Sequence, residues 1–204
     1  MIKRTFDVVT SIAALTVLWP LLIVIGLLIK LDSRGPAIYR SRRAGRWGNP
    51  FPILKFRTMV VDAENLGGPS TADDDPRVTR AGKFLRKYKF DELPQLLNVA
   101  RGEMSIVGPR PEILPEVERY SAEERQLLSV LPGITDWASL RFRNEGEILK
   151  GSADAHQAYW EKIRPEKIRL GLKYAHNHSF FEDMRILAET VTVVFRSASS
   201  DATE

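Results

Sequence analysis

The longest apolar run in the chain covers residues 12–29, IAALTVLWPLLIVIGLLI, and no charged side chain interrupts it. At ~1.5 Å per residue such a run makes a helix of roughly 27 Å, close to the thickness of the bilayer's hydrocarbon core. Trp19 and Pro20 lie near its centre. Because proline removes a backbone donor and clashes with the preceding turn, we expect the helix to break there. The pattern therefore predicts a helix, a break and a second helix within residues 1–32.

Three arrangements fit this run. A straight spanning helix would leave one of its two basic flanks on the outer side of the membrane, which the positive-inside tendency disfavours. A re-entrant helix broken at Pro20 would return both flanks to the same side. A buried core helix is the third, and the dense basic run that follows at once argues against it. The spanning and re-entrant forms both stay open at this stage, and the re-entrant form is our expectation.

Beyond residue 33 the apolar positions follow shorter periods. The segment Phe51 to Met59 mixes apolar residues with Lys55 and Arg57, which are two positions apart, and this predicts a short strand with two cations on one face. Helical spacing recurs four times further along, and one of these segments opens with the capping-box sequence SAEE. These helical segments cover residues 93–100, 121–130, 154–174 and 184–195.

The pattern as a whole predicts a helix-dominated α/β fold. Residues 33–196 form a small globular domain with a short sheet, and amphipathic helices, such as the basic segment 81–90, lie in the membrane interface. Residues 197–204 are expected to be a disordered tail. The Gly- and Pro-rich segment 67–76 carries three aspartates in a row, which is more typical of a solvated loop than of a metal site.

Composition narrows the function. The 204 residues contain no cysteine, which excludes disulfides, thiolate zinc sites and thiol nucleophiles. The net charge is +4, and six cations against one acid lie between Lys30 and Arg46, directly after the apolar run. This placement favours anionic phospholipid headgroups as a partner. Zinc-finger and RNA-binding signatures and glycine-rich nucleotide motifs do not occur in the sequence, so we expect no nucleic-acid partner.

The densest chemistry lies in residues 91–111, DELPQLLNVARGEMSIVGPRP. Asp91 and Glu92 precede a predicted helix, whose free N–H groups favour ionised carboxylates and can hold a phosphate. Acids at a helix start are usually caps, so the pair alone is weak evidence of function. Arg86 comes shortly before the pair, and Arg110 stands between two prolines that stiffen the backbone presenting its guanidinium. Carboxylates near such cations suit phosphoryl transfer.

The run DELPQLLNVARGEMSIVGPRPE resembles the signature of the bacterial sugar transferases, the monotopic phosphoglycosyl transferases. Other motifs match in the same order along the chain. They are KRTFDVV before the proline-interrupted apolar run, PAIY at 36–39, LKFRTM at 54–59, PGIT at 132–135 and SFFEDMRIL at 179–187. Several long motifs in order make the resemblance specific.

The resemblance implies transfer of a sugar-1-phosphate from a UDP-sugar to undecaprenyl phosphate, with release of UMP. It implies a monotopic enzyme on the cytoplasmic face of the bacterial inner membrane, which could pass its product to downstream glycosyltransferases. Asp91 matches the nucleophile and the Mg²⁺ ligand, and Glu92 matches its partner. The positions that match substrate- or phosphate-contacting residues are Lys55, Arg86, Arg110, Arg143 and Asp183.

The segment after PGIT departs from the family pattern. The family commonly reads PGITGxAQVxGR, whereas this chain reads PGITDWASLRFR, with Asp136, Ser139 and Phe142 at altered positions. An insertion-like stretch follows at residues 145–157. These departures leave the identity of the donor sugar undecided, whereas the intact acid pair and GPRP motif still predict the same class of reaction. The main alternative is a non-catalytic, membrane-anchored basic adaptor, which explains the apolar run and the cations but not the match around Asp91.

Overall fold

The structure is a computed structural model that describes residues 2–200. Helices account for most of the described chain, and the strands are few and short, as the sequence predicts. The elements are α1 Ile2–Asp32, β1 Ile38–Ala44, η1 Arg46–Gly48, β2 Pro50–Phe56, η2 Ala63–Asn65, α2 Arg80–Lys87, η3 Phe90–Glu92, α3 Gln95–Arg101, β3 Ser105–Val107, α4 Leu114–Glu118, η4 Glu124–Ser129, β4 Gly133–Thr135, α5 Trp137–Arg141, α6 Glu145–Leu149, α7 Ala155–Lys162, α8 Arg164–Asn177 and α9 Phe180–Ser200.

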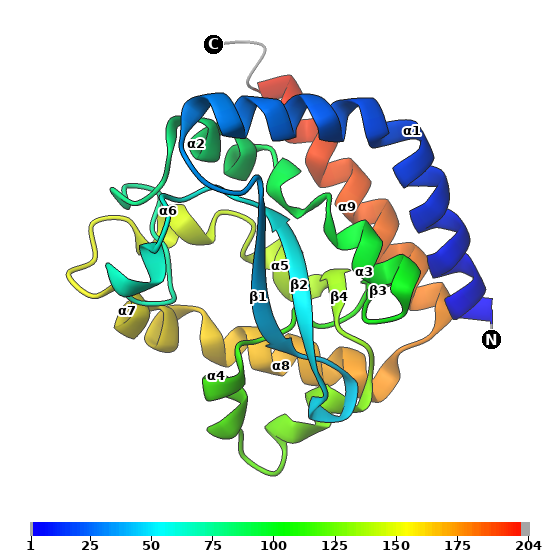
Figure 1. Cartoon of the computed structure of the whole chain (residues 1–204). Helices are drawn as coiled ribbons and strands as arrows, with labels where there is room; N and C mark the ends of the chain where they lie inside the picture. Colours follow the sequence, from blue (N-terminus) through cyan, green and yellow to red (C-terminus); the bar gives the residue numbers. More distant parts are fainter. Residues whose placement is uncertain (1, 201–204) are drawn as a thin grey trace.

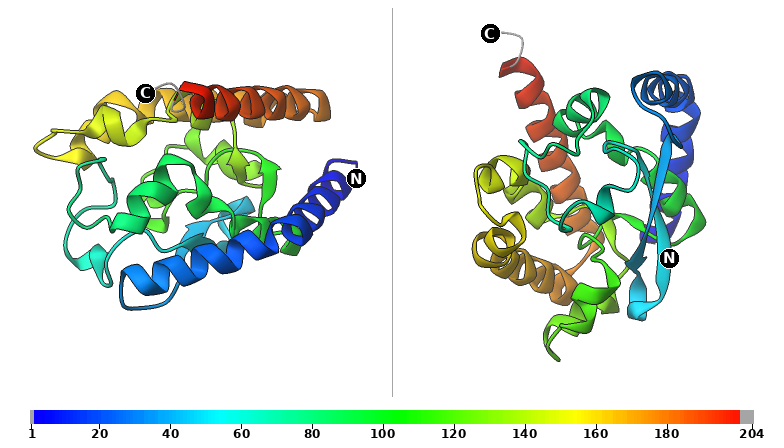
Figure 2. Two further views of the ribbon diagram at one scale, coloured as in Figure 1. Left: turned by 90° about the horizontal axis from the view of Figure 1, so that it is seen from above. Right: turned by 60° about the vertical axis from the view of Figure 1, so that its left-hand side comes forward.

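The strands form two small sheets between layers of helices. β1 and β2 make an antiparallel hairpin, and β3 pairs with β4 in parallel. Helix α1 runs along one side of the molecule, whereas α8 and α9 run along the opposite side (Figures 1 and 2). The two sides converge where the start of α1 meets the start of α9, because the Lys3 ammonium lies 2.6 Å from the Asp183 carboxylate.

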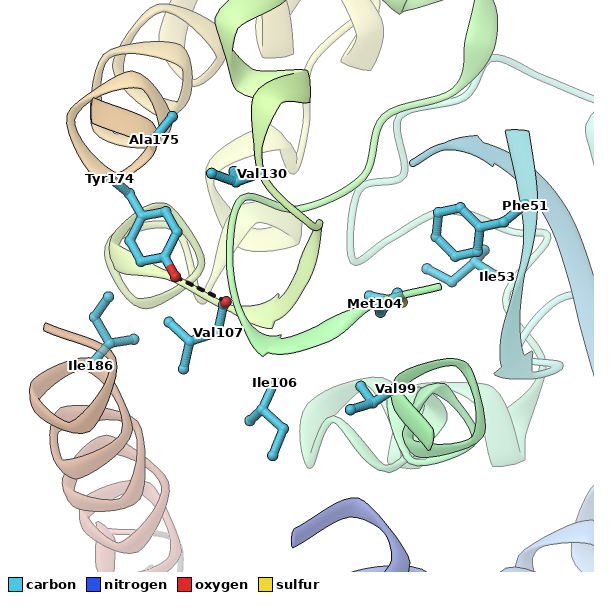
Figure 3. Close-up of a cluster of buried hydrophobic side chains, with 10 residues drawn as sticks. All are labelled: Phe51, Ile53, Val99, Met104, Ile106, Val107, Val130, Tyr174, Ala175 and Ile186. Carbon is cyan, nitrogen blue, oxygen red and sulfur yellow. Dashed lines mark hydrogen bonds between the residues drawn. The ribbon is translucent and has the colours of Figure 1, made fainter. Parts of the chain in front are cut away.

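The main apolar core joins both sheets to the helices around them (Figure 3). Val99 of α3 and Met104 are fully buried, as is Ile186 of α9. The phenol of Tyr174 in α8 donates a 3.1 Å hydrogen bond to the carbonyl of Val107 in β3. Burial of this cluster fixes β3, and with it the segment that follows β3, against α8 and α9.

Helix α1 buries polar residues and exposes apolar ones. Asp7 and Ser11 are almost completely inaccessible to solvent, whereas Val17 is 75% exposed and Trp19 is 59% exposed. Only 11% of its most apolar 18-residue stretch is buried. This rules out a core helix within the described residues, since a core helix buries its apolar side chains. By length and composition α1 is able to cross a membrane.

Pro20 lies inside a helix that continues from Ile2 to Asp32. Figure 1 shows that the axis of this helix changes direction along its length, so that its two ends follow two sides of the molecule. The second half packs on the hairpin and α2 through buried Ile25 and Ile29, which contact Phe56 and Leu85. The helix is thus bent and continuous, and the predicted re-entrant path through a membrane stays a proposal.

A buried carboxylate fastens the first half of α1 to the core. Asp7 accepts hydrogen bonds from the Ser105 hydroxyl at 2.8 Å and from the Ile106 backbone N–H at 3.1 Å. Three residues earlier in the same helix, Arg4 donates to the carbonyls of Val99 and Ala100 at the end of α3. These bonds hold α1 against the elements that flank the candidate site.

Replacing Asp7 with alanine is expected to lower the free energy of unfolding by about 2–4 kcal/mol, because it leaves a buried hydroxyl and a buried N–H without an acceptor. Thermal unfolding in detergent measures the change. Asp32→Ala is the matched control, since Asp32 is an exposed carboxylate on the same helix that bonds the Ala81 N–H. Equal losses in the two variants would show that Asp7 does not anchor the helix.

Several local predictions need correction. Arg57 does not share a face with Lys55: the strand ends at Phe56, and the buried Arg57 guanidinium donates to the carbonyls of Ser33 and Arg34. The segment predicted as helix over 121–130 forms its capping box, yet the helix it starts is a 3₁₀ helix of six residues, Glu124–Ser129. Such short turns are common, and the Leu131-Pro132 step disfavours a longer helix.

The helical segment 154–174 is two helices, which separate at Ile163. Pro165 explains the break, because its ring clashes with the carbonyl four residues earlier and it has no N–H to donate. Helix α9 begins at Phe180, earlier than predicted, where the Ser179 hydroxyl accepts from the Glu182 N–H. The expected tail boundary at residue 197 falls inside α9, and residues 201–204 lie outside the described residues.

Candidate active site

The acid pair lies in a short turn directly before α3. Asp91 and Glu92 belong to η3, and α3 begins at Gln95 after Pro94. Asp91 is 8% exposed, and its Oδ1 atom is buried without a hydrogen-bond partner among the described residues. Gln95, one turn further on, also buries an unpartnered amide nitrogen. A carboxylate oxygen without a partner in such a place is available to a ligand or to a reacting atom.

Two cations hold the second carboxylate. The Arg110 guanidinium donates to both oxygens of Glu92, with the Nη1–Oε2 distance at 3.1 Å. The Lys55 ammonium donates to Oε1 of Glu92 at 3.2 Å. The side chains of Glu92 and Lys55 are mostly buried, whereas that of Arg110 is 35% exposed. Glu92 therefore fixes both cations beside Asp91 and leaves part of Arg110 accessible.

Hydrogen bonds of the Asn98 side-chain amide to β2 place Lys55 at this position. Asn98 of α3 is fully buried, and its Oδ1 accepts from the Leu54 N–H at 2.9 Å. Its Nδ2 donates to the Pro52 carbonyl at 2.8 Å. The side chain thus pairs with β2 as a neighbouring strand would, one residue before Lys55. The sequence reasoning missed Asn98, although a polar residue among the apolar positions of α3 was the available signal.

Two glycines place Arg110. A Cβ atom at Gly108 would lie 2.4 Å from the Leu131 carbonyl oxygen, and one at Gly133 would lie 2.1 Å from the Gly108 nitrogen. The backbones after β3 and before β4 therefore approach more closely than any side chain permits. The Gly133 N–H donates to the Pro109 carbonyl at 2.9 Å, next to Arg110. The glycines of the GPRP and PGIT motifs thus act together on one arginine.

The environment moves the pKa values of the two acids in opposite directions. Burial, followed by the neighbouring charge of Glu92, raises the pKa of Asp91 above its usual range. Burial also opposes ionisation of Glu92, but Arg110 and Lys55 outweigh it and hold the pKa of Glu92 well below its usual range. Glu92 is consequently a fixed anion, and Asp91 is the acid whose charge depends on what binds beside it.

The cations respond to the same site. Burial, reinforced by the charge of Arg110, lowers the pKa of Lys55 to about 8. Glu92 raises the pKa of Arg110. Arg86 of α2 donates to the Thr58 hydroxyl at 2.9 Å, and its charge favours the ionised form of Asp91. The structure thus places Lys55, Arg86 and Arg110 near the acid pair, and their role in phosphate binding stays a prediction.

Asp183 and Arg143 have different surroundings. Asp183 is buried near the start of α9, where it pairs with Lys3 and accepts a 2.6 Å bond from the Tyr174 phenol. Arg143 donates to the Val193 carbonyl in α9 at 2.9 Å. These contacts tie α9 to α1 and to the segment after α5. Their predicted roles in substrate binding remain predictions.

The residues present fit a magnesium ion that shares its ligands with a substrate. The described residues hold no cluster of three or more acidic, histidine or cysteine side chains able to cage a metal. Mg²⁺, however, is usually held by one or two carboxylates together with substrate phosphates and water. The unpartnered Oδ1 of Asp91 would be one such ligand. Both oxygens of Glu92 are already occupied by cations.

A buried carboxylate with an unpartnered oxygen, beside an anion held by two cations, is an arrangement suited to handling phosphate groups. A sequence model of the bacterial sugar transferase family matches residues 1–197. The chain therefore belongs to the bacterial sugar transferase family.

Named relatives agree with this assignment. The chain is 35% identical to the undecaprenyl-phosphate galactose phosphotransferase of Salmonella typhimurium and 39% identical to the undecaprenyl-phosphate glucose phosphotransferase of Komagataeibacter xylinus. These matches cover 96% and 93% of the chain, but only 40% and 35% of the relatives' own lengths. The exopolysaccharide production protein PSS of Rhizobium leguminosarum bv. phaseoli is 39% identical, with 94% of each protein covered.

Proposed function

We propose that this protein transfers a sugar-1-phosphate from a UDP-sugar to undecaprenyl phosphate and releases UMP. The observation that carries the proposal is the buried Asp91, whose Oδ1 has no partner, next to a Glu92 anion that holds Arg110 and Lys55. The names of several relatives describe the same kind of transfer to undecaprenyl phosphate. Their named sugars differ, which leaves the donor of this chain to experiment.

The proposed chemistry has two displacements at one phosphorus. A carboxylate oxygen of Asp91 attacks the sugar-bearing phosphorus of the donor, the bond from that phosphorus to the bridging oxygen breaks, and UMP leaves with the electron pair. A phosphate oxygen of undecaprenyl phosphate then attacks the same phosphorus, and Asp91 leaves as a carboxylate. Arg110 and Lys55, positioned by Glu92, neutralise the charge on the donor's phosphates.

Arg86 would contact the phosphates from α2, and Arg143 and Asp183 are proposed to support the substrate site from the α9 side. Mg²⁺, when bound at Asp91, would neutralise the donor's diphosphate. The residues of this chain do the remaining work: they orient the donor, keep Glu92 ionised and shield Asp91 from water.

The protein is proposed to act at the cytoplasmic face of the bacterial inner membrane. The exposed apolar surface of α1 supports membrane insertion, and the bend of α1 supports a re-entrant path (Figure 1). We propose Trp19-Pro20 as the turning point of that path. Phe84 of α2 is 54% exposed and packs beside Tyr88, between basic side chains. Such a helix suits the headgroup region of a bilayer. The acceptor would reach Asp91 from that surface.

A donor panel tests the function. Purified protein is incubated with Mg²⁺, undecaprenyl phosphate and, in turn, UDP-glucose, UDP-galactose and their N-acetyl forms, and UMP is measured. At least one donor is expected to give UMP together with a lipid-linked sugar diphosphate. Release of UDP instead of UMP would contradict phosphosugar transfer, since it would mean that the sugar moved without its phosphate.

Cysteine labelling tests the path of α1. The sequence has no cysteine, so Ile2→Cys and Asn49→Cys each provide a single thiol at an exposed position. Both are expected to react with an impermeant reagent only from the cytoplasmic side of membrane vesicles. Lys150→Cys, on the globular domain, reports which side is cytoplasmic. Labelling of positions 2 and 49 from opposite sides would show that α1 spans the membrane.

The lowered pKa of Lys55 predicts an alkaline limit to activity. Its ammonium loses charge as the pH rises through about 8, so kcat/KM should fall about tenfold per pH unit above that value. Lys55→Arg keeps the charge and is expected to move this limb to higher pH. A profile from pH 6 to 10 measures both. If kcat/KM of Lys55→Arg falls at the same pH as that of wild type, the alkaline fall belongs to another group.

The lowered pKa of Lys55 affects stability in the direction opposite to its effect on activity. The folded protein binds this proton less tightly than the unfolded chain, whose lysine has a pKa near 10.5. Between pH 8 and 10.5 the unfolded state therefore holds more protons, and this residue's contribution to stability rises with pH. Deprotonation of Lys55 above pH 8 should therefore lower activity without destabilising the folded protein.

A further inference from the structure

A cleft with a mainly apolar lining adjoins Arg110. It is open to solvent. Arg110 lines it together with Glu116 of α4, Asp136 before α5, Tyr159 of α7 and Lys167 of α8. Since Arg110 also binds Glu92, this one guanidinium lies between the acid pair and the cleft. A ligand whose phosphate contacts Arg110 can therefore extend into the cleft.

Glu116 points to a ligand in this cleft. The residue is 8% exposed, and its Oε2 atom is buried with no hydrogen-bond partner among the described residues. Its other oxygen, Oε1, has His156 and Arg119 at 3.6 Å each, beyond normal hydrogen-bond length. A buried carboxylate oxygen without a donor is costly, so a hydroxyl or N–H from a ligand would stabilise it.

Among the described residues that line the cleft, the one buried side-chain atom without a partner is an acceptor, Oε2 of Glu116. The cations on its wall are already paired outside it, Lys167 with Glu145 at 2.6 Å and Arg164 with Glu124 at 2.7 Å. Burial raises the pKa of Asp136, so this side chain gains from a partner as well. A hexose presents many hydroxyl donors, whereas uracil presents one N–H donor and two carbonyl acceptors. The two carboxylates, Glu116 and Asp136, thus match the hydroxyl groups of a sugar better than a nucleobase.

We propose that this cleft binds the sugar of the donor and that the Glu116 and Asp136 carboxylates accept hydrogen bonds from its hydroxyl groups, which makes them specificity-determining residues. The inference rests on the proposed function, because it assumes a nucleotide-sugar whose diphosphate contacts Arg110. Asp136 and Ser139, both on the cleft wall, are two of the three altered positions after the PGIT motif. Because the side chains at these two positions differ from the family pattern, the cleft should select a donor sugar according to its own side chains.

Binding and turnover of Glu116→Gln test the proposal. This change keeps the shape of the side chain and removes its charge. For the donor that wild type prefers, both Kd and KM are expected to rise roughly tenfold, and the order of preference among UDP-sugars should change. The Kd of UDP, which lacks the sugar, should stay within about twofold. Glu118→Gln is the matched control, since Glu118 is an exposed acid on the same helix.

Asp136→Asn is the second variant, because asparagine can still cap α5 through the bond from the Ser139 N–H. It should shift donor preference in the same way if Glu116→Gln does not fold. Unchanged donor binding in the folded variants would overturn the proposal. Equal weakening of UDP and UDP-sugar would also overturn it and would assign the cleft to the nucleotide.

Equilibrium binding separates this inference from the proposed reaction. If wild type binds a UDP-sugar more tightly than UDP and Glu116→Gln removes the difference, the sugar site stands even if no UMP is released. If wild type releases UMP but binds UDP-sugars no more tightly than UDP, the reaction stands and the sugar site is wrong.

Discussion

Asp91→Asn is expected to lower the rate of UMP release by at least roughly 10³-fold, because asparagine cannot attack phosphorus to form an acyl phosphate. The fold should survive, since Oδ1 of Asp91 has no partner to lose within the described structure. Burial and the nearby Glu92 charge raise the pKa of Asp91, so a neutral amide removes a strained charge. The melting temperature is therefore expected to stay the same or to rise while activity disappears.

Asp62→Asn is the control for this experiment. Asp62 is exposed and has a left-handed backbone with φ of 60°, a conformation that asparagine adopts readily. It should therefore keep full activity and stability. Undiminished turnover in Asp91→Asn would show that Asp91 is not the nucleophile, whatever the family resemblance implies.

Arg110 carries the second large effect. Arg110→Lys keeps a positive charge but cannot contact both oxygens of Glu92, and kcat/KM should fall roughly 10²-fold or more. Arg110→Met also leaves Glu92 with Lys55 as its remaining strong cationic partner. We expect it to cost about 2 kcal/mol of stability, less than a fully buried pair, because Arg110 is partly exposed.

Arg169→Met is the matched control for both Arg110 variants. Arg169 makes a similar two-bond contact with Glu166, but its side chain is 65% exposed, so its loss should change stability little and leave activity intact. Steady-state kinetics with a fixed donor and denaturant unfolding measure the two effects. Full activity in Arg110→Lys would show that charge alone is needed at this position.

The local parts of the site were predictable from sequence. Apolar spacing after Pro94 and the acids before it predict a helix start at Asp91-Glu92, and the structure has η3 and α3 there. Two prolines around Arg110 predict a stiff segment, and both Pro109 and Pro111 are buried in the structure. The apolar run predicts α1, and its exposed surface follows from the same pattern.

The tertiary parts were not predictable, because they depend on contacts between distant segments. Lys55 reaches Glu92 only because Asn98 fixes β2 on α3, and nothing in the alternation of β2 specifies its partner. The same alternation assigned Arg57 to the wrong face, since strand parity ends with the strand at Phe56. Glu116 lines the cleft beside Arg110 because α4 lies near α7 and α8, and no local period in the sequence encodes that contact.

The central claim is that Asp91 forms a covalent phosphosugar intermediate, and an incubation without undecaprenyl phosphate tests it most directly. Wild type, Mg²⁺ and the preferred UDP-sugar should give a burst of about one UMP per protein molecule. The intact mass should rise by that of the sugar phosphate, with the added group on Asp91, and Asp91→Asn should show neither change. UMP release that requires the acceptor, with no adduct at any time, would contradict the account.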